Sequence, residues 1–563
     1  MKLVAMRPLL RGESLALIVS LWFTLACNPL FWRTLHDTRA ATHSDSWSFT
    51  FAVAVLITSI HFILLALLLN RWSAKPLLFL LLPLTALAAY DMQRYNVYLD
   101  PAMLRNVLHT HAAEAGELFS WQMLPVLMAY VVPPLWLIWR TTIRRPPLLQ
   151  AAAFRLASVL LALAIGGLSL FAVSQEFSSL MREHKELRYL VTPSNFLYSL
   201  ARALGNDSRV VSNIRSPIGS DAVLASAWGM HKKPVMLILV IGETARAANW
   251  QLSGYERETT PELARQAVIN FPHVTACGTH TEVSLPCMFS PFGRHAYDEA
   301  RIRSSESLLH VLRRAGFRVV WLDNQSGCKG VCGDMETWRP NAVDTPADCQ
   351  GNDCYDQALL TGLKKYADSA AENTVFVLHP LGNHGPAYYR RYPPAFRHFQ
   401  PACESPDLGQ CSREEIRNAY DNALRYTDHW LASTIDFLKQ RQGSYDTAML
   451  YVSDHGESLG ENGLFLHGAP YAIAPDVQKQ VPMLLWLSDT FARSFNVDAR
   501  CLQSRANQAQ THDHIFHTVL GLLDVRTTTY DPAYDFTRAC RPATDFASST
   551  GLPGHPAIEK RPA

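Results

Sequence analysis

Hydrophobic and polar positions divide the chain into two parts with different patterns. The first part contains five long, mainly apolar runs, at about residues 12–32, 49–70, 75–93, 121–139 and 154–174. Each is close to the roughly 20 residues with which a helix crosses a bilayer. From residue 234 onward, short apolar runs alternate with amphipathic segments of helical period. The pattern therefore predicts a transmembrane domain of five helices at 1–174, followed by a globular domain.

The second part has the alternation of strands and helices that is typical of α/β domains. We predict strands at 235–241, 317–322, 374–378, 446–452 and 481–487, and helices at 308–315, 356–370, 413–440 and 511–525. This order favours a mostly parallel sheet. We place the α/β domain at 234–540. A charged, amphipathic stretch at 181–190 predicts a bridging helix within a linker at 175–233, and the Pro-, Ser- and Gly-rich residues 541–563 predict a disordered tail.

Basic residues predict the orientation of the helices. Lys and Arg gather before the first run, between the second and third, and around the loop between the fourth and fifth, at Lys2, Arg7, Arg11, Arg71, Lys75, Arg140, Arg144, Arg145 and Arg155. The positive-inside rule places these segments in the cytoplasm and the α/β domain on the far side of the membrane, which is the periplasm in a bacterium. The first run has no small-residue cleavage site, so we do not expect a cleaved signal peptide.

The cysteines point to the same compartment. Of the eleven cysteines, only Cys27 falls in the apolar part. We predict that the other ten form disulfides. Pairing neighbours in the sequence gives Cys277–Cys287, Cys328–Cys332, Cys349–Cys354 and Cys403–Cys411, and the two cysteines that remain give Cys501–Cys540. Disulfides form in oxidising compartments. A metal or redox site at Cys328 and Cys332 is the alternative. The net charge of +2, without a basic stripe, gives no indication of nucleic-acid binding.

Acidic residues and histidines follow three of the predicted strands. Glu243 comes after 235–241, Asp454 and His455 come after 446–452, and His384 follows 374–378. Strands of a parallel sheet end at one edge, where sites collect. Glu, Asp and His beside a Thr hydroxyl suit a tetrahedral zinc site. Taken singly, each residue could equally be an ordinary loop or core residue.

Two further segments carry candidate chemistry. Residues 277–290 form a disulfide-bracketed turn with Thr279 and Thr281 before an apolar run, which predicts a hydroxyl at a helix start, either as a nucleophile or as a plain N-cap. In the loop after the third run, Asp100-Pro101 predicts a helix start. The spacing i, i+4, i+8 then puts Asn106, Thr110 and Glu114 on one face, which either meets a lipid head group or is simply solvated.

These motifs together resemble one family. The matching blocks are Gly-Glu-Thr-Ala-Arg at 242–246, Gly-Tyr-Glu-Arg-Glu-Thr-Thr-Pro at 254–261, the 277–290 turn, Gly-Cys-Lys-Gly at 327–330, Gly-Asn-His-Gly-Pro at 382–386, Ser-Asp-His-Gly-Glu-Ser-Leu-Gly-Glu-Asn-Gly at 453–463, and 464–486. Nearly the whole chain is similar to the phosphoethanolamine transferases that modify lipid A, which include the mobile colistin-resistance enzymes.

The resemblance implies a sulfatase or alkaline-phosphatase-like core that binds zinc. It implies one zinc ion and leaves open whether a second ion binds. It implies Thr281 as the nucleophile, with Glu243, Asp454 and His455 completing the zinc site; Thr279 is the poorer match. Lys329, His384 and His467 resemble residues that hold the phosphate or a second metal and take part in catalysis, with Ser326 and Glu457 nearby. Asn106, Thr110 and Glu114 resemble residues that meet the ethanolamine group.

The implied reaction has two lipid substrates. Phosphoethanolamine passes from phosphatidylethanolamine to a lipid A phosphate through a threonine intermediate, diacylglycerol leaves, and the cell gains polymyxin resistance. The resemblance places a monomeric, multi-pass enzyme in the bacterial inner membrane. The acceptor could instead be a core sugar, Kdo, heptose or periplasmic glucan. A phosphoglycerol transferase, a sulfatase-like hydrolase and a membrane sensor are further alternatives; a Thr nucleophile, in place of a modified Cys, argues against a sulfatase.

Overall fold

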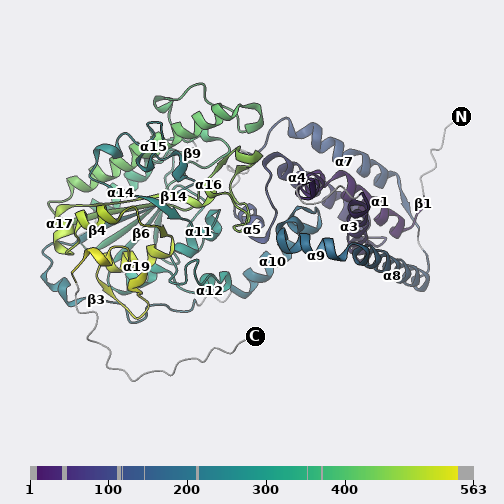
Figure 1. Cartoon of the computed structure of the whole chain (residues 1–563), viewed down its shortest axis with the longest axis horizontal. Helices are drawn as coiled ribbons and strands as arrows, with labels where there is room; N and C mark the ends of the chain where they lie inside the picture. The colour runs from purple at the N-terminus through teal and green to yellow at the C-terminus, as the bar shows by residue number, and fades with distance from the viewer. Residues whose placement is uncertain are drawn as a thin grey trace, which may run out of the picture.

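The computed structural model describes residues 9–40, 47–110, 116, 118–144, 146–210, 215–350, 353–368 and 372–542. It has two parts lying side by side, a helical N-terminal part and an α/β part (Figure 1). The helical part consists of α1 (Gly12–Ala26), α2 (Pro29–Ala40), α3 (Trp47–Leu68), α4 (Ala74–Tyr95), α7 (Met123–Arg140) and α8 (Leu148–Ala172), with short strands β1 (Leu9–Leu10) and β2 (Thr142–Ile143).

Four of the predicted transmembrane helices are continuous, and the first is not. Within the described residues, α3, α4, α7 and α8 are long and apolar enough to cross a membrane, and α1 with α2 makes a fifth span only as a pair bent by 53°. The run predicted at 12–32 is therefore two helices that meet at a bend and not one continuous helix. Pro29 has no backbone N–H, and Asn28 donates from Nδ2 to the carbonyl of Phe23 at 2.7 Å, which ends α1.

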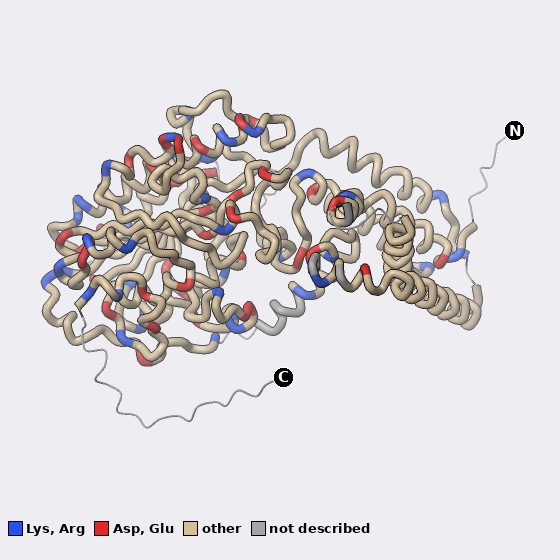
Figure 2. The backbone as a smooth tube through the Cα atoms, viewed as in Figure 1, with Lys and Arg blue, Asp and Glu red and all other residues tan. Residues whose placement is uncertain are grey.

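Charged residues are sparse along these helices. Figure 2 shows long stretches of α7 and α8 without a charged residue. Large apolar side chains on α8 are exposed, among them Leu156, Leu160, Leu163, Leu168 and Phe171. A helix that presents such residues outward is stable in lipid, because the bilayer core is as apolar as the side chains.

Shorter helices lie between the two parts. These are α5 (Pro101–His109), α9 (Ser174–Glu183), the 3-10 helix η1 (Lys185–Leu190) and α10 (Ser194–Val210). The helix predicted at 181–190 is interrupted at His184, where the backbone leaves the helical region. Helix α5 begins as predicted, since Asp100 accepts a hydrogen bond from the N–H of Met103 at 2.7 Å.

Helix α5 ends earlier than the predicted Asn106, Thr110 and Glu114 face requires. Thr110 is its C-cap, with extended backbone (φ −70°, ψ 133°), so the helix does not continue past His109. The Thr110 hydroxyl instead donates to the carbonyl of Asn106 at 2.8 Å. Glu114 lies outside the described residues.

The α/β part is built on a mixed sheet. In the described residues its eight strands have the order β15-β5-β14-β11-β4-β10-β6-β7. The strands are β4 (Val235–Gly242), β5 (Ile269–Thr275), β6 (Arg318–Asp323), β7 (Glu336–Trp338), β10 (Thr374–His379), β11 (Asp446–Ser453), β14 (Gln480–Leu487) and β15 (Gln510–Thr511). All five predicted strands are present. Only β14 runs antiparallel to its neighbours β11 and β5, so the mostly parallel prediction is confirmed.

Two hydrophobic cores cover the two faces of this sheet. Along β4, Leu237 and Leu239 belong to the core with α13 (Leu308–Arg314) and α19 (Asp513–Leu522). The alternate residues Ile238 and Val240 belong to the core with α14 (Ala358–Asp368) and α15 (Arg413–Gln440). A strand that is buried on both faces forms a continuous apolar run, which is why the sequence indicated β4 so clearly.

The disulfides are those predicted. Cys277–Cys287, Cys328–Cys332, Cys349–Cys354, Cys403–Cys411 and Cys501–Cys540 are bonded. Cys27 is free and buried in the helical part. All eleven cysteines lie in described residues.

Polar contacts join the two parts. Arg94 pairs with Asp407, Arg105 with Glu299, and His109 with Glu282, while the Asn96 amide donates to the carbonyl of Gly463. Arg105 is only 1% exposed. The contacts of Arg105 and His109 hold helix α5 against α12 (Glu299–Ser304) and α11 (Thr281–Met288) of the α/β part.

Candidate active site

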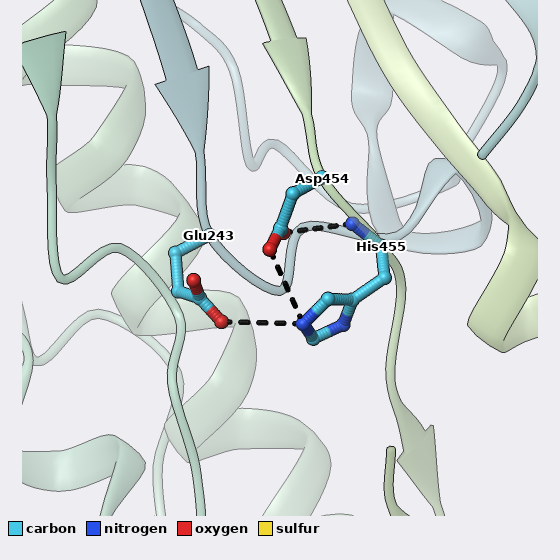
Figure 3. Close-up of side chains that lie close together, drawn as sticks. All are labelled: Glu243, Asp454 and His455. Carbon is cyan, nitrogen blue, oxygen red and sulfur yellow. Dashed lines mark hydrogen bonds and ion pairs between the residues drawn. The ribbon is translucent and has the colours of Figure 1, made fainter. Parts of the chain in front are cut away.

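The carboxyl ends of two neighbouring strands bring the candidate metal ligands together. Strands β4 and β11 are parallel, and Gly242 pairs with Ser453 in the last register position. Glu243 and Asp454 are the next residues, so their carboxylates leave the sheet side by side, and His455 follows. Figure 3 shows both carboxylates pointing toward the imidazole of His455.

Glu243, Asp454 and His455 have the geometry of a metal site. One ligand atom from each residue lies within 4.8 Å of the others, and all three are buried. The Nε2 atom of His455 is 3.3 Å from Oε1 of Glu243 and 3.4 Å from Oδ2 of Asp454. The distance from Zn²⁺ to a nitrogen or oxygen ligand is about 2 Å, so a cluster of this size suits one ion.

Two details support the fit of a cation. The buried Oδ2 atom of Asp454 accepts no hydrogen bond from any described residue, which is costly unless a ligand binds there. The Nδ1 atom of His455 lies 2.9 Å from the carbonyl oxygen of Gly456. That contact puts the Nδ1 proton toward the carbonyl and points the other nitrogen at the two carboxylates, as metal-binding histidines do. The donor set therefore fits zinc.

The electrostatics of the cluster also favour a cation. Burial and the charge of Glu243 raise the pKa of Asp454 to about 6. Burial lowers the pKa of His455, but Asp454 and Glu243 outweigh it and raise that pKa to about 10. Burial opposes ionisation of Glu243 as well, yet the hydrogen bond and charge of His455 hold its pKa well below the usual range. A proton on His455 thus balances the carboxylates in the metal-free protein.

Thr281 is the hydroxyl that the fold presents to this cluster. It is the first residue of α11 (Thr281–Met288), and its Oγ1 donates to Oε2 of Glu243 at 3.1 Å and lies 3.5 Å from Nε2 of His455. Thr279, the local competitor, donates to the carbonyl of Ala469 at 2.7 Å instead. The N-terminus of α11 adds a partial positive charge where an anionic group would sit.

The backbone after β4 is strained, and this fixes Glu243. Thr244 has φ +59°, which is uncommon for a β-branched residue, and its hydroxyl donates to Oε1 of Glu243 at 2.6 Å. Gly382 approaches the same residue from the loop after β10, and a Cβ there would lie 2.7 Å from the carbonyl oxygen of Glu243. Tight packing on both sides holds the carboxylate in one position.

The histidines predicted for phosphate or proton chemistry lie next to the cluster. The ring centroid of His467 is 4.3 Å from that of His455 and 5.4 Å from that of His384. The Nδ1 atom of His467 also lies 3.3 Å from Oε2 of Glu457. Burial, and then the charges of His455 and His384, hold the pKa of His467 well below its usual range. His467 is therefore neutral at neutral pH.

Lys329 and Ser326 lie in a cavity that is also lined by Glu282, the residue after Thr281. The ammonium of Lys329 donates to Oγ of Ser326 at 2.6 Å and is 3.3 Å from Oε1 of Glu282. Both residues, with His109, Arg215 and Arg303, line a cavity of about 540 Å³. Asn106 and Thr110 are not among its described lining residues, whereas His109, from the same helix, is.

Glu282 is a residue of this site that the sequence analysis missed. It directly follows Thr281, is 1% exposed and pairs with His109, Arg303 and Lys329. Burial raises its pKa, but the hydrogen bond with His109 and the charges of Lys329 and Arg303 outweigh burial and depress it strongly. The signal in the sequence was a lone carboxylate within an otherwise apolar helix.

Comparison with known proteins decides the family. The family model described as phosphoethanolamine transferase EptA/EptB matches residues 57–207, and the sulfatase model matches residues 236–525. The chain is 37% identical over 543 residues to phosphoethanolamine transferase EptA of Escherichia coli strain K12, covering 96% of this chain and 99% of that protein. The chain belongs to the phosphoethanolamine transferase family.

Other members of this family agree over most of the chain. Phosphatidylethanolamine transferase Mcr-1 of Escherichia coli is 35% identical over 523 residues, covering 90% of this chain and 94% of that protein. The structure of the integral membrane lipooligosaccharide phosphoethanolamine transferase A from Neisseria meningitidis is 34% identical, with a TM-score of 0.89, covering 95% of this chain and 99% of that one. This phosphoethanolamine transferase is therefore a multi-pass membrane enzyme with a sulfatase-like α/β part, as the sequence predicted.

Proposed function

We propose that this phosphoethanolamine transferase moves phosphoethanolamine from phosphatidylethanolamine to a phosphate of lipid A, through a covalent intermediate on Thr281 at a zinc site. The observation that carries the proposal is the 3.1 Å contact of the Thr281 hydroxyl with Glu243, inside the cluster with Asp454 and His455. The chain then divides into a transmembrane domain (1–174), a linker (175–233), a catalytic domain (234–540) and a tail (541–563). It lies in a bacterial inner membrane, with the catalytic domain in the periplasm.

The cluster prepares the nucleophile. Glu243, Asp454, His455 and Thr281 would hold the ion, and a bound zinc ion lowers the pKa of a coordinated hydroxyl toward neutrality and neutralises developing negative charge. Thr281 then attacks the phosphorus of phosphatidylethanolamine. The bond between phosphorus and the glycerol oxygen breaks, diacylglycerol leaves, and phosphoethanolamine remains esterified to the threonine.

Neighbouring residues handle charge and protons. Lys329, with Ser326, offers donors to the equatorial phosphate oxygens, where negative charge accumulates in the transition state. His467 or His384 acts as the general acid or base, taking up the proton that Thr281 loses and passing it to the departing diacylglycerol oxygen. In the second half-reaction a phosphate oxygen of the acceptor attacks the same phosphorus and frees the threonine. Two such displacements imply ping-pong kinetics.

The position of the site suits lipid substrates. Helix α5 of the N-terminal part contributes His109 to the cavity, so the cavity faces the membrane side of the catalytic part. Transfer gives the acceptor phosphate a cationic ammonium group. The cell surface becomes less anionic, cationic polymyxins bind less well, and the cell becomes resistant.

Mass spectrometry of lipid A tests the proposal. Cells that express the chain should gain a phosphoethanolamine increment on lipid A and grow at higher polymyxin concentrations, whereas cells with Thr281→Ala should do neither. Thr490→Ala, on the surface helix α17 (Asp489–Ser494), is the matched control and should behave as wild type. An increment on core sugars alone would move the acceptor to another envelope glycan. An increment that persists in Thr281→Ala would refute the threonine intermediate.

A further inference from the structure

Glu282 contacts two cationic side chains and a histidine, which come from three separate segments. Its Oε1 is 3.0 Å from Nδ1 of His109 on α5 and 3.3 Å from Nζ of Lys329 in the loop after β6. Its Oε2 is 3.1 Å from Nη2 of Arg303 on α12 (Glu299–Ser304). A carboxylate that is 1% exposed is expensive to bury, and these partners offset that cost.

Lys329 depends on this carboxylate for its position. Its side chain is 5% exposed, and its backbone has φ +47°, next to Gly330 at φ +90°, so the loop itself is in an unusual conformation. Its ammonium donates to Oγ of Ser326 at 2.6 Å and lies 3.3 Å from Oε1 of Glu282. Of these two only Glu282 carries a charge, and it is fixed to the nucleophile because Thr281 precedes it in the same helix turn.

We infer that Glu282 is a positioning residue of the transfer reaction: it holds the ammonium of Lys329 at the first turn of α11, the helix that begins with Thr281. Through His109 the same carboxylate also joins α5 of the membrane part to the helix that carries the nucleophile. The inference rests on the proposed function, since it gives Lys329 the task of holding a phosphate oxygen. Glu282 itself acts through Lys329, and its own carboxylate would repel a phosphate.

A double-mutant cycle in the full-length protein tests this role. Transfer from a fluorescent phosphatidylethanolamine is measured in detergent micelles for the wild type, Lys329→Ala, Glu282→Gln and the double variant, with incubations long enough to quantify slow variants. We expect Glu282→Gln to lower kcat by about 10- to 100-fold, the rate equivalent of one lost charge-assisted hydrogen bond. We expect the double variant to be no slower than Lys329→Ala alone, because Glu282 has nothing left to position.

A matched control separates this role from a general effect of losing a glutamate charge. Like Glu282, Glu262 has a carboxylate oxygen 3.0 Å from the Nδ1 atom of a histidine, here His429, but Glu262 is half-exposed and lies outside the site. The control variant is Glu262→Gln. It should leave kcat unchanged. If Glu282→Gln does not fold, Glu282→Asp takes its place in the cycle, because it keeps the charge but withdraws it by one methylene group.

The possible results are distinct. Wild type without any transfer would refute the proposed function itself. Transfer that needs Thr281 but is as fast in Glu282→Gln as in the wild type would overturn the inference alone. A double variant whose loss equals the product of the two single losses would also overturn it, because Glu282 would then act independently of Lys329.

Discussion

Zinc binding to the metal-free protein should release a proton from His455. In the structure the Nε2 atom of His455 lies 3.3 Å from Glu243 and 3.4 Å from Asp454, and these two carboxylates outweigh burial and raise the pKa of His455 to about 10. At neutral pH this nitrogen therefore carries a proton. A metal ion binds only the deprotonated imidazole, so the ion and the proton compete for one position.

The magnitude follows from the raised pKa. Because the pKa of His455 is raised above its ordinary value of 6.5, the proton stabilises the metal-free fold fully below pH 6.5, and this stabilisation is lost as the pH rises through about 10. Zinc affinity has the opposite dependence. With one proton displaced, the apparent Kd should tighten about tenfold per pH unit between pH 6.5 and 8.5, or about 1.4 kcal/mol per unit.

Calorimetry of the full-length protein measures the proton directly. The Thr281→Ala variant is treated with a chelator and then titrated with zinc at pH 7.5 in buffers of different ionisation enthalpy. This variant is used because it has no Thr281 hydroxyl that could release a second proton. The slope of observed heat against ionisation enthalpy should correspond to about one released proton. His429→Gln, which alters a half-exposed histidine outside the site, should give the same slope. A slope near zero, or a Kd that does not change with pH, would refute this account of the cluster.

Three substitutions test other parts of the structure. Gly382→Ala puts a Cβ 2.7 Å from the carbonyl oxygen of Glu243 at a backbone φ of +55°, so thermal unfolding should show that the free energy of unfolding falls by about 2 kcal/mol or more. Gly443→Ala is the control, because nothing lies within 4 Å of a Cβ there. Equal melting temperatures for the two variants would contradict the strain at Gly382. His467→Gln should lower kcat by about 100-fold or more while the zinc content by elemental analysis stays unchanged, and loss of zinc would place His467 among the metal ligands. Arg105→Met removes one of the two basic partners of Glu299 at the contact between the two parts. Because Arg303 still pairs with Glu299, the melting temperature should fall by the equivalent of about 1.5 kcal/mol, and an unchanged value would show that the pair contributes little.

The sheet and the cluster at its edge followed from local sequence. Strands β4 and β11 are continuous apolar runs because both of their faces are buried, and Glu243 and Asp454 come directly after them. Parallel neighbours end at one edge, so adjacency in space followed from the order of the elements. Strand β5 was not predicted. Pro272 interrupts its pattern, and its pairing with β14 shifts register between Val481 and Met483, where a strand tolerates a proline.

Features that depend on distant residues were not accessible in the same way. The role of Glu282 needs Arg303 and Lys329 from other segments and His109 from the other part of the chain, and no spacing in the sequence brings these together. The early end of α5 was also missed. The Thr110 hydroxyl bonds to the backbone of Asn106 there, and threonine side chains compete in this way with helix continuation.

The cavity lined by Glu282 and Lys329 has walls from both parts of the chain, and this matters for inhibitor screening. His109 comes from α5, whereas Glu282, Arg303 and Lys329 come from the α/β part. A catalytic fragment cut away from the helical part would present this cavity without His109, and Glu282 would have one partner fewer. Compounds selected against such a fragment are selected for a cavity that lacks the wall supplied by α5. Screening the whole protein in lipid would instead favour compounds that contact both parts and hold them together.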